Sequence, residues 1–335
     1  RGESVQALTM AMIEVLKPGL ETCVQDYPGR KGAFGMGFPP SGPVDHWSFR
    51  LANILVGNAP GAAALECQFI GPALKFKAPA VIALCGGDMA AKLDGAPVPL
   101  WQSIAVNAGQ TLALASALTG ARTYLAIAGG IDTPPFLGSR STFVLGDCGG
   151  LNGAALKVGG EIPVGSGEGK AGRQVMESCR PAISENHRWQ IEVCAGPNDD
   201  WIDEAGQKRF LNSEWKLSPK SNRVGFRLEG PEWSFTEKAT NKAPENGSDP
   251  SNTIDHGYPI GAINLCGQTP IILLHDTLTL GGFINPFTVP SCAFWKLGQS
   301  RPGDIYDFEL LSVDEAQARK RAINAMCSED IIEAV

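Results

Sequence analysis

The stretch AVIALCGGDMAAKLDGAPVPLWQSIAVNAGQTLALASALTGARTYLAI, residues 80–127, decides the fold class of this chain. It consists of short apolar runs separated by polar turns, and the runs are Ala80–Leu84, Ser103–Val106, Thr111–Ala115 and Thr123–Ile127. Between them lie Asp94–Gly95 and Asn107–Ala108–Gly109, which are typical turn sequences. Runs of this length are shorter than most helices, so the stretch predicts consecutive β-strands.

The same pattern continues along the 335-residue chain, which contains 40 glycines and 24 prolines. Further strand-length runs are Met12–Leu16, Trp189–Val193, Gly225–Leu228, Ala262–Leu265, Ile271–Leu274 and Ile305–Leu310. Helical spacing of apolar residues is rarer and is found at Trp47–Val56, Asp199–Leu211, Ser291–Leu297 and Val313–Met326. Ser312 or Asp314 would cap the last helix. We therefore predict a mainly β protein with a few short helices.

The length predicts two units, at roughly 100–200 residues per domain. The segment Gly165–Asn186 is polar and glycine-rich, and it has the composition of a linker. We predict an N-terminal β lobe over residues 12–165, a C-terminal β lobe over 187–312, and a terminal helix and tail over 313–335. Gly165–Lys170 resembles a phosphate-binding loop, but Ala171 replaces the required Ser or Thr, so we expect this chain to bind no ATP.

Composition argues against several functional classes. The net charge is −7 and no basic stretch stands out, so nucleic acid is not expected as a partner. No apolar run reaches the ~20 residues of a membrane helix. The nine cysteines form no CxxC pair and there are four histidines, so we expect buried thiols and no metal site. Unpaired thiols suit a reducing compartment, which predicts a cytoplasmic protein.

A first polar stretch precedes the predicted helix at Trp47. It places Ser41 and Asp45 ahead of the helix, while Arg50 and Asn53 lie on the helix itself. The free N–H groups of a helix start suit an anionic ligand. Ser41 or Asp45 would equally serve as an ordinary helix cap, and from chemistry alone capping is the favoured interpretation.

Two further polar stretches lie near the strand Ile271–Leu274. The first, Ser251–Asn264, gathers Asn252, Asp255 and His256 before a strand. The second follows directly after the strand and contains His275, Asp276, Gly281 and Gly282. Polar residues at a strand end, next to glycines that allow close approach of a ligand, are typical of a binding site. A strand end with internally satisfied side chains remains the alternative.

Taken in order, these motifs resemble one family. Ser41–Gly–Pro–Val–Asp45 with Phe49–Asn53 and Ala64–Glu66, then Tyr124–Ile131 and Phe136–Arg140, and finally His275–Phe283 and Trp295–Asp304, resemble allophanate hydrolase subunit 2, also called carboxyltransferase subdomains A and B. The similarity extends over about residues 13–312. His275–Asp276 and Leu280–Phe283 look like the urea carboxylase type, whereas the C subunit of 5-oxoprolinase usually has Ala-Asp and Thr-Gly-Gly-Tyr. Urea carboxylases usually have His-Asp-Asn where this chain has Ile254–Asp255–His256, which leaves urea, guanidine or another small amide open as acceptor.

The resemblance implies a cyclophilin-like β-barrel and a carboxyltransferase activity. A carboxyl group would move from N-carboxybiotin, carried on a separate domain, to a nitrogen of a small amide. The implied partners are a carboxyltransferase subdomain C and D half, similar to allophanate hydrolase subunit 1, together with biotin carboxyl carrier and biotin carboxylase domains. The chain would then be nearly inactive alone. A subunit of an ATP-dependent 5-oxoprolinase and a non-catalytic regulatory protein remain as alternatives.

The resemblance also suggests roles for individual residues. Asp255 and Asn252 would hydrogen-bond the acceptor, and His275 and Asp276 would orient them or relay a proton. The anionic groups would be held by Ser41, Arg50 and Arg140. The remaining predicted substrate-site residues are Asp45, Asn53, Gly281 and Gly282.

Overall fold

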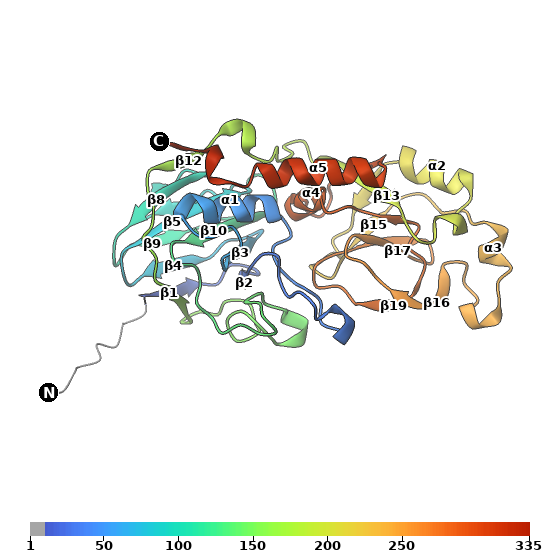
Figure 1. Cartoon of the computed structure of the whole chain (residues 1–335), viewed down its shortest axis with the longest axis horizontal. Helices are drawn as coiled ribbons and strands as arrows, with labels where there is room; N and C mark the ends of the chain where they lie inside the picture. Colours follow the sequence, from blue (N-terminus) through green and yellow to red (C-terminus); the bar gives the residue numbers. More distant parts are fainter. Residues whose placement is uncertain (1–10) are drawn as a thin grey trace.

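The computed structural model describes residues 11–335 and shows two β-rich lobes, with helix α5 (Val313–Ala325) running along one side of both (Figure 1). Most of the regular structure is strand, and the prediction of a mainly β protein with a few short helices is confirmed. The four runs predicted within residues 80–127 form β5, β8, β9 and β10, and the Asp94–Gly95 turn joins two further short strands, β6 and β7.

The N-terminal lobe is built from two sheets. The six-stranded sheet has the order β11-β1-β4-β9-β6-β7 and the seven-stranded sheet the order β2-β3-β10-β5-β8-β12-β22. Apolar side chains such as Leu65, Leu84, Leu125 and Ile162 are fully buried in one cluster contributed by both sheets. The strand bounds are β1 Ala11–Lys17, β2 Cys23–Gln25, β3 Ala64–Gln68, β4 Ala73–Phe76, β5 Ala80–Gly86, β6 Lys92–Leu93, β7 Ala96–Pro97, β8 Gln102–Val106, β9 Thr111–Ala113, β10 Arg122–Ile127, β11 Glu161–Val164, β12 Arg173–Val175 and β22 Ile332–Ala334.

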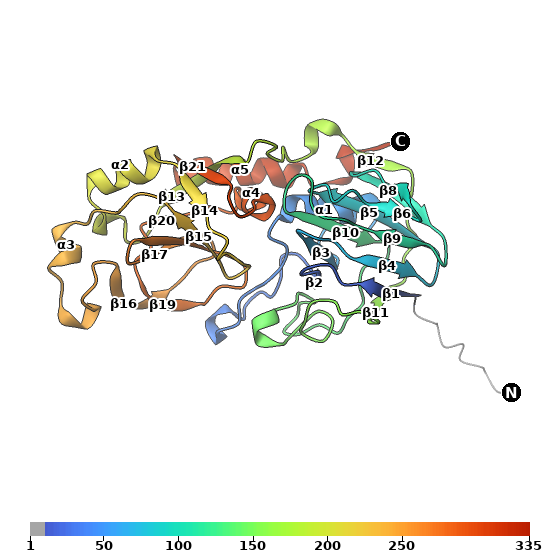
Figure 2. The same cartoon turned by 180° about the vertical axis from the view of Figure 1, so that it is seen from behind.

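The C-terminal lobe is a closed barrel with the strand order β13-β20-β17-β18-β15-β14-β21. It closes through the parallel pairing of β13 with β21, which brings the first and last strands of the lobe together. A separate two-stranded sheet, β16 with β19, stands at one end of the barrel (Figure 2). The bounds are β13 Arg188–Ala195, β14 Trp215–Leu217, β15 Gly225–Glu229, β16 Asn252–Gly257, β17 Ala262–Cys266, β18 Thr269–Leu273, β19 Leu280–Phe283, β20 Phe287–Thr288 and β21 Ile305–Leu310.

The helices follow the predicted positions with two corrections. Helix α1 (His46–Val56) begins after Asp45, whose side chain accepts from the N–H groups of Trp47 and Ser48. The helix predicted over 199–211 is instead a 3-10 turn at Asp199–Trp201 followed by α2 (Glu204–Asn212), because Asp203 caps a new helix start. The helix predicted from Ser291 begins later, as α4 (Phe294–Gln299). Helix α3 (Glu237–Thr240) completes the set.

The terminal helix α5 starts as predicted at the Ser312 cap, where Ser312 and Glu315 form a capping box. Beyond it, the chain returns to the N-terminal lobe and β22 pairs with β12. The segment 165–186, which the sequence predicts as a linker, therefore contains a strand that pairs with β8 as well. Strand pairing thus continues past the predicted lobe boundary at residue 165.

Within residues 11–335, no helix is long and apolar enough to span a bilayer. The same residues contain no cluster of three or more His, Cys, Asp or Glu side chains arranged to hold a metal ion.

The barrel depends on an aromatic stack around Phe210 of α2. The Phe210 ring lies 4.3 Å from Phe308 and 4.5 Å from Phe287 between centroids, and 5.0 Å from Trp233. Phe210→Ala would remove this contact from a fully buried site, which typically costs about 3–5 kcal/mol. We expect a loss of that size in the free energy of unfolding, measured by urea denaturation. Lys208→Ala, an exposed change on the same helix, should cost less than about 1 kcal/mol, and an equal loss in both variants would contradict this role of Phe210.

Candidate functional site

A buried arginine, Arg223, joins the two lobes. It comes from the loop before β15 and donates from Nε to Asp276 Oδ2 (2.8 Å) and from Nη2 to Gly42 O (2.9 Å). Its Nη1 forms an ion pair with Glu66 of β3, in the other lobe. Arg223, Glu66 and Asp276 are all at least nine-tenths buried, so the contacts are shielded from water. One guanidinium therefore fixes strand β3, the loop at Gly42 and the end of β18 relative to one another.

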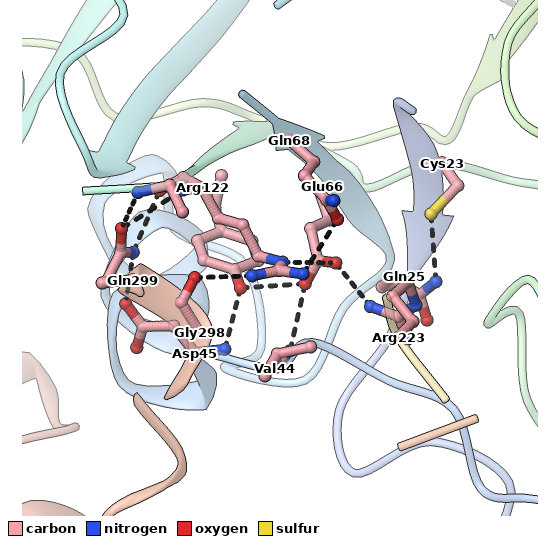
Figure 3. Close-up of polar contacts among 12 residues, drawn as sticks. Cys23, Gln25, Val44, Asp45, Glu66, Gln68, Arg122, Arg223, Gly298 and Gln299 are labelled. Carbon is pink, nitrogen blue, oxygen red and sulfur yellow. Dashed lines mark hydrogen bonds and ion pairs between the residues drawn. The ribbon is translucent and has the colours of Figure 1, made fainter. Parts of the chain in front are cut away.

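Glu66 is also the centre of a second group of contacts (Figure 3). Arg122 Nε lies 3.3 Å from Glu66 Oε1, and Tyr124 donates its hydroxyl to Oε2 over 2.8 Å. The backbone N–H of Val44 donates to the same oxygen at 3.0 Å. A neighbouring contact ties the start of α1 to the end of α4, because Asp45 Oδ2 accepts a hydrogen bond from Gln299 Nε2 at 2.8 Å. The carboxylate of Glu66 is thus saturated with donors.

The electrostatics of this network favour an ionised Glu66. Burial by itself raises the pKa of Glu66, but the charges of Arg223 and Arg122 outweigh it and hold the pKa below its ordinary value. At Asp45 the balance is reversed: burial raises its pKa, and hydrogen bonds from Ser48, Gln299 and Trp47 offset only part of the desolvation. The network is therefore a structural ion cluster, with its charges compensated internally.

Next to this cluster lie polar atoms without partners. Ser41 donates its backbone N–H to His275 O (3.0 Å), so the predicted residues Ser41, His275 and Asp276 do come together. Ser41 Oγ, His275 Nδ1 and Thr277 Oγ1 are buried and have no hydrogen-bond partner among the described residues. Ser41 also adopts a left-handed φ of 54°, a strained conformation for a residue with a side chain. Buried groups left unsatisfied in this way require an explanation, and a bound water, ion or ligand is one of them.

Burial lowers the pKa of His275 to about 3, with the Arg223 charge as the second cause. The imidazole is therefore neutral at physiological pH, and it carries one N–H and one lone pair. A neutral imidazole can donate to or accept from a polar ligand without adding charge.

A cavity of about 720 Å³ opens between the barrel strands β15, β17 and β18 and the β16–β19 sheet. Thr277 lines it, as do the predicted Gly281 and Gly282. Its charged lining residues are Lys220 and Arg227, and no acidic side chain lines it. A Cβ at Gly281 would lie 2.6 Å from the Tyr258 hydroxyl, so this position tolerates only glycine. The cavity is thus mostly apolar with a positive rim, which suits a small anionic or carboxylated ligand.

The predicted acceptor residues lie on the β16–β19 sheet. Asp255 lines a separate cavity of about 370 Å³, shared with Phe34 and Gly35 of the N-terminal lobe. A Cβ at Gly282 would come within 3.0 Å of Asp255 Oδ1, so glycine there leaves room for the carboxylate. Asn252 lines neither cavity, and its carbonyl accepts from Lys242 Nζ at 2.6 Å.

Ser41, His275 and Asp276 line neither cavity, and the remaining predicted residues are not brought to the cavities either. Asp45 is fully buried and caps α1, in agreement with the capping interpretation, so its oxygens are unavailable to a ligand. Asn53 donates to Ala62 O (2.9 Å), a structural contact. Arg140 binds Thr133 O and pairs with Asp132 in a partly exposed loop. Arg50 donates to Asn324 and His46, on the side of α1 that faces α5.

Sequence reasoning missed the arginines that organise the site, Arg122 and Arg223, and the cavity residues Lys220 and Arg227. Glu66 was identified within a motif and given no role. The Arg223–Glu66 contact joins residues 157 positions apart, so no local sequence pattern predicts it. The available signal was indirect: an acidic residue at the centre of a buried strand, between Leu65 and Cys67, requires a buried partner.

The carboxyltransferase domain family, subdomain A and B, matches residues 36–310. The chain is 41% identical over 317 residues to the urea amidolyase of Saccharomyces cerevisiae, a match covering 92% of this chain and 17% of the yeast protein. It is 34% identical over 309 residues to the C subunit of 5-oxoprolinase from Escherichia coli, with 91% of this chain and 93% of the bacterial protein covered. The crystal structure of the K. lactis urea amidolyase is similar, with a TM-score of 0.89 and 38% identity over 97% of this chain and 21% of that one. The chain therefore spans less than a quarter of the length of either amidolyase.

Removing the charge of Glu66 should destabilise the fold. Breaking a buried ion pair leaves its partners uncompensated and typically costs about 3–5 kcal/mol. We expect Glu66→Gln to lower the free energy of unfolding by roughly this amount in urea denaturation at neutral pH. Asp307→Asn, which breaks an exposed pair with Arg188, should cost about 0–1 kcal/mol and is the matched control.

The loss of folding stability at acidic pH should also depend on Glu66. Because the pKa of Glu66 is lower in the folded protein than in the unfolded chain, its contribution is present above the unfolded pKa and is lost as pH falls through the folded pKa. Wild-type stability should therefore decrease as the pH drops below the ordinary value of 4.5, and Glu66→Gln should show a shallower decrease. Identical slopes for the two proteins, measured by urea denaturation across this range, would rule out a depressed pKa at Glu66.

Proposed function

The chain belongs to the carboxyltransferase subdomain A and B family, and we propose that it forms one half of a site that moves a carboxyl group from N-carboxybiotin to a nitrogen of urea or a related small amide. The observation that carries this proposal is the cavity at Thr277. It combines an apolar wall, a positive rim and a buried hydroxyl without a partner. These are the features that a flat polar group bearing a carboxylate requires.

The residues present fit the carboxylated ureido group of biotin. Lys220 and Arg227 would hold its carboxylate, and Thr277 would donate to the ureido oxygen. Gly281 and Gly282 line the cavity, and the absence of side chains there leaves room for Tyr258 and for the Asp255 carboxylate. When bound, this group supplies the carboxyl carbon for transfer. A donor aimed at the ureido oxygen stabilises the charge that develops there as the carboxyl group departs, so Thr277 would act mainly on the transition state.

The acceptor would be oriented from the β16–β19 sheet. Asp255 would accept hydrogen bonds from the N–H groups of a urea-like molecule, because a carboxylate offers two acceptor oxygens. His275, neutral and buried, and Ser41 would align the loop and the strand end through their contact. Asp276 is held by Arg223, so its role is to position the strand end and not to move a proton.

The site would be completed by other polypeptide segments. The chain covers 17% of the yeast urea amidolyase, so a biotin carboxylase, a biotin carrier and a subdomain C and D half would lie outside it. The carrier would deliver the carboxylated biotin, and the other half would close the site. The chain alone should therefore show little activity.

A second candidate, a component of an ATP-dependent 5-oxoprolinase, is favoured by one observation. The match to the C subunit of 5-oxoprolinase from Escherichia coli covers 93% of that protein, so the similarity extends along nearly the whole of this subunit. The higher identity to urea amidolyase, 41% against 34%, supports the first candidate.

The two candidates differ in the substrate that drives turnover. The chain would be combined with its subdomain C and D half and with carrier loaded with carboxybiotin, and loss of the carboxyl group from biotin would be measured. We expect urea or guanidine to accelerate the loss and 5-oxoproline to have no effect. The opposite result, with 5-oxoproline consumed in an ATP-dependent mixture lacking biotin, would assign the chain to the oxoprolinase type.

Removal of the Thr277 hydroxyl tests whether the cavity at Thr277 is the functional site. Thr277→Val keeps the shape of the side chain and removes a buried hydroxyl that has no partner, so the fold should be as stable as wild type or slightly more stable. Activity of the reconstituted enzyme should fall about 10- to 100-fold in kcat/KM, since a hydrogen bond to developing charge is lost. Thr22→Val, at another buried unpartnered hydroxyl, should leave activity unchanged. Full activity in Thr277→Val would exclude a donor role for this residue.

A further inference from the structure

Helices α1 and α5 meet through a group of basic side chains away from the cavity at Thr277. Arg50 donates from Nε to His46 O (3.0 Å) and from Nη1 to Asn324 Oδ1 (3.0 Å). Its guanidinium lies over the Tyr27 ring, 5.0 Å from the centroid. Lys320 extends from α5 to His46, with Nζ 2.7 Å from Nε2. The contacts found for both cations are thus with neutral groups.

The contacts of His46 determine where its ring proton lies. Arg50 Nη2 is 3.2 Å from Nδ1, and a guanidinium nitrogen can only donate. Nδ1 is therefore the acceptor, and the neutral ring carries its proton on Nε2. Nε2 lies 3.0 Å from Ser291 O, which can accept its proton, and 2.7 Å from Lys320 Nζ.

An ammonium group at Lys320 does not suit this arrangement. It has three donors and no lone pair, so it would oppose the Nε2–H of His46 at 2.7 Å. A neutral amine has a lone pair and can accept from that N–H. Burial and the Arg50 charge lower the pKa of Lys320 to about 8, in the direction that the geometry requires. Burial and the Lys320 charge likewise hold the pKa of His46 well below its ordinary value, so the ring is neutral.

Lys320 is half-buried and accessible from the surface. It lines a cavity of about 320 Å³ that it shares with Ser291 and Arg321. Burial raises the thiol pKa of both Cys292 and Cys327 to about 11, and raises that of Cys194 as well, so these thiols are uncharged at physiological pH. Among the described residues, the titratable groups around Lys320 are Arg50, His46 and the neutral His275, Arg321 on the wall of the same cavity, and these three neutral thiols.

We propose that Lys320 is a carbamylation site, at which the free amine adds to CO₂ and the resulting carbamate is stabilised by Arg50 and Arg321. The nitrogen lone pair forms a bond to the carbon of CO₂. The electron pair of one C–O π bond moves onto its oxygen, which becomes a negatively charged carbamate oxygen. One proton leaves the nitrogen for solvent, so the product carries one negative charge and no oxidant or second substrate is needed.

The charges at the site select CO₂ among the electrophiles that react with amines. A carbamate supplies the anion that Arg50 lacks in its described contacts. Acylation of Lys320 would give a neutral amide and would leave the charge of Arg50 uncompensated. CO₂ is also small enough for a cavity of this size, and its carbamate would link α5 to α1 through a new charge pair.

The chain alone, without carrier or acceptor, is sufficient for the test, so the result is independent of the proposed carboxyl transfer. Protein would be equilibrated with isotopically labelled bicarbonate, carbamates would be trapped with a trialkyloxonium salt, and the modified peptide would be found by mass spectrometry. Label should appear at Lys320, at roughly tenfold or more above exposed lysines at neutral pH, because a lower pKa leaves more free amine. Labelling should rise with pH and reach half its maximum near about 8.

Three variants separate this proposal from incidental labelling. Lys320→Arg should lose the label and Lys216→Arg, at an exposed lysine of β14, should keep it. His46→Phe removes the Nε2–H donor and should reduce labelling by restoring the ammonium form, with the fold checked by circular dichroism. Labelling of Lys320 at the level of exposed lysines, or a titration near the ordinary lysine value of 10.5, would overturn the proposal.

Discussion

The arrangement of the two lobes depends on the pairing of Arg223 with two carboxylates, Glu66 from one lobe and Asp276 from the other. A guanidinium cannot lose its proton at physiological pH, so a buried Arg223 demands fixed anions on its edges. Arg122 adds a second cation to Glu66, and Tyr124 and Val44 fill its remaining acceptor sites. Any rotation of the lobes would separate these charges in a medium of low dielectric, which makes the junction a rigid element.

That rigidity explains how the candidate site can hold strained and unsatisfied groups. Ser41 is in the left-handed region next to Gly42, and the carbonyl of Gly42 is fixed by Arg223. His275 and Thr277 flank Asp276, which is fixed by the same arginine. A single cation therefore positions the loop at Ser41 and the end of β18 together. Unpartnered hydroxyls at such a place persist because the surrounding contacts determine the backbone, and this leaves them free for a ligand.

The sequence predicted those parts of the structure that local chemistry determines. The β class follows from short runs between turn residues, and the caps at Asp45 and Ser312 follow from residue preference at a helix start. The helix predicted over 199–211 is divided because Asp203 caps a second helix start, and the composition of this segment does not predict which residue acts as the cap. At the site, the motif containing His275 and Asp276 was evident, whereas the partner of Asp276 was not. Ion pairs between distant segments arise from the tertiary arrangement, so no local sequence pattern predicts them.

The surface around the candidate site fits the proposal that this chain forms one half of a catalytic unit. Met36, Ile254, Leu278 and Leu280 are large apolar side chains with 58–69% of their surface exposed, and Leu278 and Leu280 line the cavity at Thr277. Met36 ends the 3-10 helix Phe34–Met36, whose other residues line the cavity at Asp255. Apolar side chains at the mouths of these two cavities gain free energy when another surface covers them. Closure would also remove water from the positive rim of Lys220 and Arg227 and strengthen its hold on a carboxylate. The exposed rim and the unsatisfied hydroxyl therefore agree with the proposal that this chain provides an ordered surface and that a second half would complete the enclosure.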